Sequence, residues 1–486
     1  MDYNKLNIEE AAKGLQEKKF SASELVDSCF EQINKYDNEI GAFLEISKDL
    51  AIEQAKEADK KISKGDKGLL TGVPLSIKDI ILVKDVKATG GSKILENYIA
   101  TYDATVIKKL KDEGAIFLGK VNLDEFAMGS STENSAYKKT KNPWDKERVP
   151  GGSSGGSTSS VAADMCLGSL GTDTGGSIRQ PASFCGVVGL KPTYGRVSRY
   201  GVMPMTSSLD QVGPITKTVK DAAILFNAIA GIDPNDSTTY KKENINIDNI
   251  TKDIKGLKIG IPKEYFIEGM DPEVQKSIDQ AIKQFEELGA KVVKVSLPLT
   301  KHALAIYYIM ASSEISSNLA KYDGIRYGYS ATKDTAENLL DVYVNSRSKG
   351  LGSEAKRRIM MGTYSLSSGY YDQYYIKAQK VRVLIQEEFN NIFKKVDCLI
   401  SPTTPSTAFK IGEKFEDPLM MYLSDIYTVP ANIGGICGIS IPAGMSNNLP
   451  IGLQIMGKSF DEEMILRAGY NFEKVTDWHT KRPSLD

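Results

Sequence analysis

Two glycine-rich loops carry the hydroxyl groups that could perform covalent chemistry. The first is the glycine and serine run at 151–160, and the second, at 171–179, contains Gly175-Gly176-Ser177. Glycines let backbone N–H groups crowd around a developing oxyanion, and hydroxyls beside such amides are candidate nucleophiles. The same composition is also typical of two tight turns in which glycine relieves backbone strain, and the pattern alone does not separate these interpretations.

Lys78 is a candidate general base. It lies in the apolar segment 73–81, whose isoleucine and leucine content and short length predict a buried strand. Burial disfavours the ammonium form and lowers the lysine pKa from about 10.4 by as much as several units, so a buried lysine can act as a base near pH 7. The alternative is a surface lysine on an edge strand.

Histidine offers little to such a site. The chain has only two, His302 and His479, and neither lies near a candidate nucleophile. A serine nucleophile in this chain would therefore need a lysine as its base. The segment 114–121 also matches the phosphate-binding pattern G-x-x-x-x-G-K. However, Val121 stands where a Mg²⁺-binding hydroxyl is required, and a helix leads into a strand there, so we interpret this match as coincidence.

Helix-then-strand units must position these residues. Ser21 and Glu24 predict a capping box, Asp103 predicts a helix cap, and Asp271-Pro272 predicts a helix that ends at Gly289. We expect further strands at 115–118, 257–261, 291–295, 398–400, 438–441 and 451–455. This alternation predicts an α/β fold with helices on both faces of a sheet.

Composition narrows the class of protein. The chain has 486 residues, 61 basic and 62 acidic side chains, and 41% hydrophobic residues, which is typical of a soluble globular protein. The net charge of -1 argues against a broad nucleic-acid-binding face. No apolar run approaches the roughly 20 residues of a membrane span, and no secretory signal is evident. Five widely spaced cysteines form no C-x-x-C pair, so we expect no metal site and a cytoplasmic location.

Lys78, the run 151–156 and the segment 175–177 together resemble the amidase signature family, over nearly the whole chain. The resemblance implies a Ser–Ser–Lys triad in which Ser177 is the nucleophile and forms the acyl-enzyme. Ser153, after a cis peptide bond, would bridge Ser177 to Lys78, the base. The oxyanion hole would be formed by the backbone amides of Thr174, Gly175, Gly176 and Ser177.

The same resemblance implies the architecture. It is a single large amidase-signature domain, with a mixed central β-sheet covered by helices on both faces, an α/β/α sandwich. We expect one domain over 1–486, with an N-terminal helical part at about 1–65 and a catalytic core at about 66–230. The rest of the sheet and the substrate-pocket helices would occupy about 255–486, after a polar surface connection.

Four stretches resemble one branch of the family more closely, namely 189–201, 208–214, 322–328 and 366–372. This branch contains the glutaminase subunits, called the A type, of glutamyl-tRNA(Gln) amidotransferases. It binds glutamine through a tyrosine, an arginine and an aspartate, which the sequence matches to Tyr308, Arg358 and Asp425. Arginine can hold the α-carboxylate through a bidentate pair and aspartate can pair with the α-ammonium. The adjacent Arg357 is an alternative carboxylate partner.

The implied reaction is hydrolysis of the side-chain amide of glutamine, with ammonia passing through a channel to a partner subunit. That partner, of the B type, would use ATP and Mg²⁺ to amidate Glu-tRNA(Gln), while a small subunit of the C type joins the two. This chain would itself hold no cofactor or metal and would meet tRNA only through its partner. Acceptor choice belongs to the partner, so Asp-tRNA(Asn) stays open as a second substrate.

Two rival functions remain. A stand-alone amidase would share the triad but would lack the Arg358 and Asp425 clamp. A catalytically silent scaffold or nucleotide-binding subunit would not need Lys78, Ser153 and Ser177 together, so their joint presence counts against it.

Overall fold

A single mixed sheet runs through the whole molecule. The computed structural model describes residues 2–326, 328–333 and 336–486, so Tyr327 of the 322–328 stretch lies outside the described residues. The sheet has 11 strands with both parallel and antiparallel neighbours. In spatial order they are β1 (Phe43–Ile46), β3 (Ile116–Val121), β2 (Pro74–Lys78), β4 (Gly168–Asp173), β6 (Gln211–Thr216), β5 (Val188–Lys191), β10 (Cys437–Ser446), β11 (Leu449–Gly457), β9 (Cys398–Pro402), β7 (Lys258–Pro262) and β8 (Lys291–Val295).

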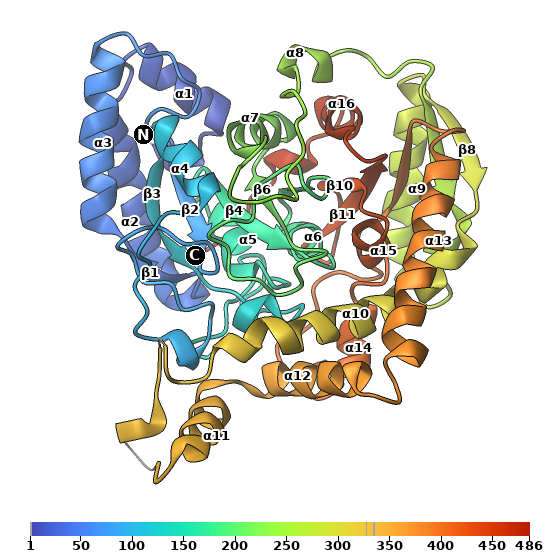
Figure 1. Ribbon diagram of the computed structural model, residues 1–486. Helices are drawn as coiled ribbons and strands as arrows, with labels where there is room; N and C mark the ends of the chain where they lie inside the picture. The colour runs from blue at the N-terminus through green and yellow to red at the C-terminus, as the bar shows by residue number, and fades with distance from the viewer. Residues whose placement is uncertain (1, 327, 334–335) are drawn as a thin grey trace.

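Helices cover the sheet on both faces. Figure 1 shows α7 and α16 on one side of the sheet and α10 and α12 on the other. The helices are α1 (Ile8–Gln16), α2 (Ala22–Ile40), α3 (Lys48–Ser63), α4 (Thr105–Asp112), α5 (Gly155–Ala162), α6 (Arg179–Cys185), α7 (Val219–Ile229), α8 (Ile247–Ile250), α9 (Pro272–Glu287), α10 (Ala303–Asn318), α11 (Leu339–Gly350), α12 (Ser353–Leu366), α13 (Lys377–Ile392), α14 (Pro418–Leu423), α15 (Val429–Ile433) and α16 (Glu462–Lys474). The predicted α/β/α sandwich is confirmed.

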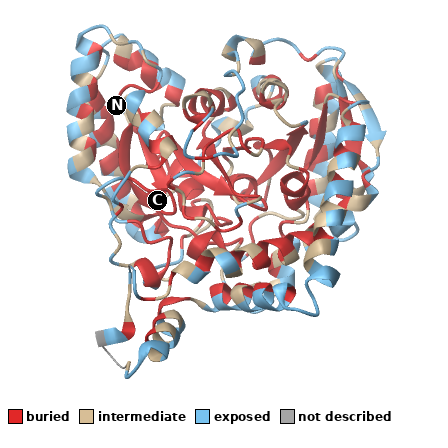
Figure 2. Cartoon of the chain, in the orientation of Figure 1, coloured by how far each residue is buried: buried red, intermediate tan, exposed pale blue. Residues whose placement is uncertain are grey.

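The middle of the sheet is the most deeply buried part of the molecule. Every residue of β2, β4 and α5 is buried, although α5 consists mostly of glycine, serine and threonine. Figure 2 shows this buried centre inside helices whose outer faces are exposed. Buried hydroxyls need hydrogen-bond partners, so a buried helix of this composition indicates a site built from hydroxyl contacts rather than an ordinary apolar core.

Of the three helix starts that local signals predicted, two are confirmed. Ser21 and Glu24 form the predicted capping box, and Asp271 accepts a hydrogen bond from the amide of Glu273 at the start of α9. The predicted Asp103 cap is wrong. The N-cap of α4 is Ala104, and the Asp103 carboxylate instead accepts hydrogen bonds from the Lys84 amide and the Lys111 ammonium, two stronger local partners.

Each predicted strand is present, but β1, β4, β5 and β6 were not predicted. Three of these four contain glycine, which is depleted in strands and masks their pattern. The segment that matches a phosphate-binding pattern forms β3, where Lys120 is buried and lies 3.0 Å from Asp79. Within the described ranges, no helix combines the length and apolar character that crossing a membrane requires.

Candidate active site

Lys78 ends β2 in the centre of the molecule, surrounded by hydroxyl groups. Its Nζ lies 2.8 Å from Ser153 Oγ, 2.8 Å from Ser154 Oγ and 2.8 Å from Thr172 Oγ1. Thr172 reaches it because β4 runs parallel to β2 as its neighbour in the sheet. The strand pairing thus joins the lysine to the second glycine-rich loop, at Thr172, which is 94 residues away in sequence.

Burial sets the protonation state of Lys78. The side chain is fully buried, and desolvation lowers its pKa to about 7, although the charges of Asp124, Asp173 and Asp210 oppose the shift. About half of the lysine is therefore neutral at pH 7. A neutral amine can accept the proton of the Ser153 hydroxyl that it contacts, which an ammonium group cannot do.

The candidate nucleophile lies on the adjoining loop. The Gly152–Ser153 peptide bond is cis, as the family resemblance implies. The amide of Ser154 donates to the carbonyl oxygen of Ser177 at 3.2 Å, which holds the two loops together. Ser177 is half-buried, and its hydroxyl forms no hydrogen bond to any residue that the structure describes. The Lys78–Ser153 contact of the predicted triad is therefore formed, whereas no hydrogen bond joins the Ser153 and Ser177 hydroxyls among the described residues.

The backbone around Ser177 presents free N–H groups. Among the described residues, the amides of Thr174, Gly175 and Ser177 have no acceptor, whereas Gly176 donates to Asp173 Oδ1 at 2.9 Å. Gly176 has a φ of +140°, and a Cβ there would lie 2.1 Å from Thr428 Oγ1, so glycine is required. The oxyanion hole stays a prediction, and three of its four amides are available in this geometry.

A buried ion pair holds this loop in shape. Asp173 and Arg179 are both fully buried and lie 3.0 Å apart. Burial would raise the pKa of Asp173, but the Arg179 guanidinium outweighs it and lowers that pKa to about 2. Asp173 also accepts the amide of Ile178 at 3.2 Å, so one carboxylate orders both sides of Ser177.

We expect Asp173→Ala to destabilise the fold strongly. The substitution leaves the Arg179 guanidinium buried without its charge partner, which costs roughly 3–5 kcal/mol. Urea unfolding monitored by circular dichroism measures the change in free energy. Lys481→Ala is the matched control because it removes an exposed ion pair with Asp477, and its unfolding midpoint should barely move. An Asp173→Ala midpoint equal to that of the control would contradict this role.

The predicted substrate residues form a second group. Tyr308 stacks on Tyr422 with ring centroids 3.8 Å apart, and the Arg358 guanidinium lies 4.7 Å from the Tyr308 centroid. Arg358 is 3% exposed, and its Nε donates to Glu354 at 2.7 Å. Arg357 also contacts Glu354, but its side chain is 43% exposed. Arg358 is thus the buried, preorganised guanidinium of the two.

Asp425 has one oxygen without a partner. Its Oδ2 accepts the Ser130 hydroxyl, whereas Oδ1 is buried and has no hydrogen-bond partner among the described residues. Burial raises the pKa of Asp425 to about 7. Thr428 donates to the backbone carbonyl oxygens of both Asp425 and Gly175, so the backbone at Asp425 is tied to the Ser177 loop. A buried carboxylate oxygen without a hydrogen-bond partner destabilises the fold, and a cationic group of a ligand would supply that partner.

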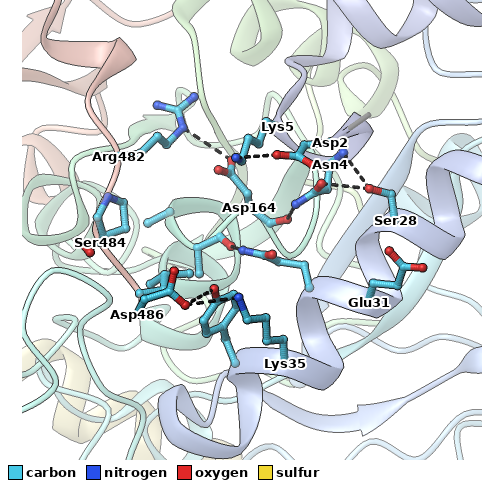
Figure 3. Close-up of a pocket in the computed structure, with 16 residues that line it drawn as sticks. Asp2, Asn4, Lys5, Ser28, Glu31, Lys35, Asp164, Arg482, Ser484 and Asp486 are labelled. Carbon is cyan, nitrogen blue, oxygen red and sulfur yellow. Dashed lines mark hydrogen bonds and ion pairs between the residues drawn. The ribbon is translucent and has the colours of Figure 1, made fainter.

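A small cavity borders part of this second group, with both Arg357 and Arg358 in its lining but not Tyr308 or Asp425. It has a volume of about 220 Å³ and is bordered by Gly129, Ser130, Glu354, Arg358 and Tyr422. A larger cavity of about 630 Å³ lies between the two ends of the chain and contains none of the predicted site residues. Figure 3 shows that its charges largely pair with one another, Lys5 with Asp2 and Lys35 with Asp486. Of these two cavities, the smaller one is bordered by predicted substrate residues, namely Arg358 and the alternative Arg357.

Sequence analysis missed several residues of the site. It assigned no role to Ser130, Ser154, Thr172, Asp173, Arg179, Glu354, Tyr422 or Thr428. Four of these lie inside or beside the two glycine-rich loops, so treating every polar residue of 151–160 and 171–179 as a candidate would have found Ser154, Thr172, Asp173 and Arg179. The others come from distant segments, and no local pattern marks them.

Comparisons with known proteins agree with this geometry. The family described as Amidase matches residues 24–466. The A-type subunit of glutamyl-tRNA(Gln) amidotransferase from Desulfatibacillum aliphaticivorans is 54% identical over 100% of both chains. The protein of the same name from Geobacillus sp. (strain WCH70) is 56% identical over 97% of each chain.

A solved structure supports the same relationship. The crystal structure of the A-type glutamyl-tRNA(Gln) amidotransferase subunit from Thermotoga maritima superimposes with a TM-score of 0.82 at 43% identity. The match covers 98% of this chain and 96% of that chain. The sheet, the hydroxyl-rich centre and the sequence relationship agree, and the chain belongs to the amidase family.

Proposed function

We propose that this chain is the glutaminase subunit of a tRNA-dependent amidotransferase, which releases ammonia from glutamine. The observation that carries the proposal is the bare, buried Oδ1 of Asp425. Ser130, which donates to the other oxygen of this carboxylate, borders the same cavity as Arg358, and Thr428 joins the backbone of Asp425 to the Ser177 loop. A carboxylate and a guanidinium beside a nucleophile match the α-ammonium and α-carboxylate of an amino-acid amide.

The proposed reaction begins with attack of Ser177 Oγ on the side-chain amide carbon. Ser153 takes the proton of Ser177 and passes its own proton to neutral Lys78, which thereby becomes an ammonium. The oxyanion of the tetrahedral intermediate is stabilised by the amides around Ser177. Collapse of the intermediate breaks the C–N bond, and the proton returns through Ser153 to the leaving nitrogen, so ammonia departs and a γ-glutamyl ester remains.

The second half repeats these transfers with water. Lys78, again neutral, draws a proton from water through Ser153, and the hydroxide attacks the ester carbonyl. Ser177 leaves with the returning proton, and glutamate is released. The products are therefore glutamate and one ammonia per glutamine, and the chain ends in its starting protonation state.

The partners in this proposal follow from the names of the relatives, which are subunits of glutamyl-tRNA(Gln) amidotransferase. We expect a partner of the B type to bind ATP, Mg²⁺ and Glu-tRNA(Gln), and a small C-type subunit to join the two. This chain would hold no cofactor, and the complex would work in the cytoplasm. Use of Asp-tRNA(Asn) would depend on the partner, because in this proposal the partner and not this chain binds the aminoacyl-tRNA that accepts the ammonia.

The clamp separates this function from that of a stand-alone amidase. Loss of one partner from a buried charge pair costs roughly 2–5 kcal/mol, so Arg358→Ala and Asp425→Ala should lower kcat/KM for glutamine about 30-fold to several-thousand-fold. A plain aliphatic amide has no α-ammonium or α-carboxylate, so its kcat/KM should barely change. Both substrates are measured with the partner subunits present.

Arg357→Ala is the matched control, because Arg357 contacts the same Glu354 but its side chain is 43% exposed. It should leave both substrates nearly unaffected. Equal losses on the two substrates would show that Arg358 and Asp425 only support the fold. If kcat/KM for glutamine alone falls in Arg357→Ala and not in Arg358→Ala, Arg357 is the residue that binds the substrate carboxylate. If kcat/KM falls in none of the variants, the stand-alone amidase is favoured.

A further inference from the structure

A second buried carboxylate lies near the cavity and takes no part in the proposed reaction. Glu125 is 2% exposed, and its Oε2 accepts the backbone amide of Gly352 at 2.8 Å. Its Oε1 accepts the hydroxyl of Ser92, which also lies 3.2 Å from the carbonyl oxygen of Gly350. Glu125 thus contacts the junction between α11 and α12, which is 227 residues away in sequence.

That junction begins the helix that carries the clamp. Gly352 is the N-cap of α12, and because it has no side chain it cannot cap the helix itself. A carboxylate at a helix N-terminus accepts an unpaired amide and interacts favourably with the helix dipole. A Cβ at Gly352 would lie 2.5 Å from Glu125 Oε2, so glycine allows this carboxylate to approach from outside the helix.

Glu125 also belongs to the loop that supplies another part of the cavity lining. The loop 124–134 supplies Gly129 and Ser130, and Asp124 braces it by accepting the amides of Thr132 and Asn134. Phe126 and Ala127, directly after Glu125, have φ values of +47° and +63°. Non-glycine residues adopt such values rarely, and they persist where the surrounding structure enforces them, often at functional sites.

One side chain therefore connects these two parts of the lining. Arg358 and Glu354 extend from α12, and Ser130, which holds Asp425, extends from the 124–134 loop. Glu354 lies one turn or less from Gly352, so a shift at the start of α12 moves Glu354 and Arg358 directly.

We propose that Glu125 is a positioning residue for glutamine: its carboxylate fixes the start of α12 against the 124–134 loop and so sets the spacing between Arg358 and Asp425. This inference rests on the proposed function. It predicts that Glu125 affects recognition of the amino-acid end of the substrate and not the chemistry at Ser177.

The experiment compares Glu125→Ala with Glu125→Gln. A displacement of about 1 Å can cost about 100-fold in kcat/KM, so Glu125→Ala should lower kcat/KM for glutamine about 10- to 100-fold, through a higher KM because the clamp binds the substrate. The kcat/KM for a plain aliphatic amide should stay within about 2-fold, because that substrate does not use the clamp. In Glu125→Gln, the amide side chain keeps an oxygen that accepts from Gly352 and gains an N–H that donates to Ser92. This variant should therefore keep the KM for the substrate glutamine within about 3-fold of the wild-type value.

Glu473→Ala is the matched control. Glu473 is also a buried carboxylate that accepts an amide at the first residue of a helix, that of Val219 in α7, at 2.9 Å. Glu473 lies away from the cavity. Its replacement should therefore lower the stability of the fold without changing the ratio of kcat/KM for glutamine to kcat/KM for the aliphatic amide. Glu125→Asp, which withdraws the carboxylate by one methylene, serves if Glu125→Ala does not fold, and the same change in the ratio is expected.

The outcomes separate this inference from the proposed function. A wild-type complex that does not hydrolyse glutamine overturns the proposed function before any variant is considered. If wild type is active and the Glu125 variants leave the ratio of kcat/KM for glutamine to kcat/KM for the aliphatic amide unchanged, the positioning role is wrong. It is equally wrong if Glu125→Gln fails to restore KM, or if Glu473→Ala shifts the ratio as much as Glu125→Ala does.

Discussion

Replacement of Ser177 by alanine should reduce glutamine hydrolysis about 10⁴- to 10⁶-fold, because the nucleophile is lost while the oxyanion donors remain. Ser177 is half-buried, and its hydroxyl has no hydrogen-bond partner among the described residues, so its removal should hardly change the free energy of unfolding. Ammonia release from glutamine measures the activity, and urea unfolding measures the stability of the same preparation.

Ser159→Ala provides the control for this result. Ser159 belongs to the other glycine-rich run, 151–160, and is fully buried, but its hydroxyl donates to the carbonyl oxygen of Lys141, away from Lys78. The control should lose some stability and keep most of its activity. Substantial glutamine hydrolysis by a folded Ser177→Ala protein would exclude Ser177 as the nucleophile.

Replacement of Lys78 by alanine should be nearly as damaging, and arginine should not restore activity because it stays protonated. Desolvation lowers the pKa of Lys78 to about 7, so the neutral base predominates above pH 7 and is lost below it. The kcat/KM of wild type should therefore fall as the pH decreases through about 7. A plain aliphatic amide is the better substrate for this profile, because Asp425 also has a pKa of about 7 and would affect glutamine binding in the same range.

Lys191 allows a stringent control for this profile. It is also fully buried, and desolvation together with the Arg179 charge lowers its pKa to about 7. Its Nζ contacts the Pro192 and Ile436 carbonyl oxygens and Gln211 rather than the candidate serines. Lys191→Met should keep the same pH midpoint. A flat profile between pH 6 and 9 in wild type, with an active Lys78→Arg protein, would show that Lys78 is structural.

The parts of the site that could be predicted are those with local patterns. Lys78 is conspicuous because a charged residue interrupts an apolar strand, and Ser153 and Ser177 because glycines surround them. The Ser21–Glu24 capping box and the β-branched strands were predictable for the same reason, since their determinants lie within a few residues of one another.

The rest depends on contacts between distant segments. The Ser130–Asp425 hydrogen bond spans 295 residues, and the Glu125–Gly352 bond spans 227. Neither partner carries a distinctive pattern, so only the folded chain reveals the pair. The strand β4 was missed for a different reason, because its glycines and polar residues serve the site and depart from the usual strand composition.

The most direct test of the central claim is identification of the covalent intermediate. The wild-type complex is mixed with saturating glutamine, quenched in acid during turnover, digested and analysed by mass spectrometry. We predict one γ-glutamyl group, sensitive to hydroxylamine as an ester, on the peptide that contains Ser177, and no such group in Ser177→Ala. A γ-glutamyl group on another residue, or steady consumption of glutamine with no acylated Ser177 peptide detected at any quench time, would contradict the proposed mechanism.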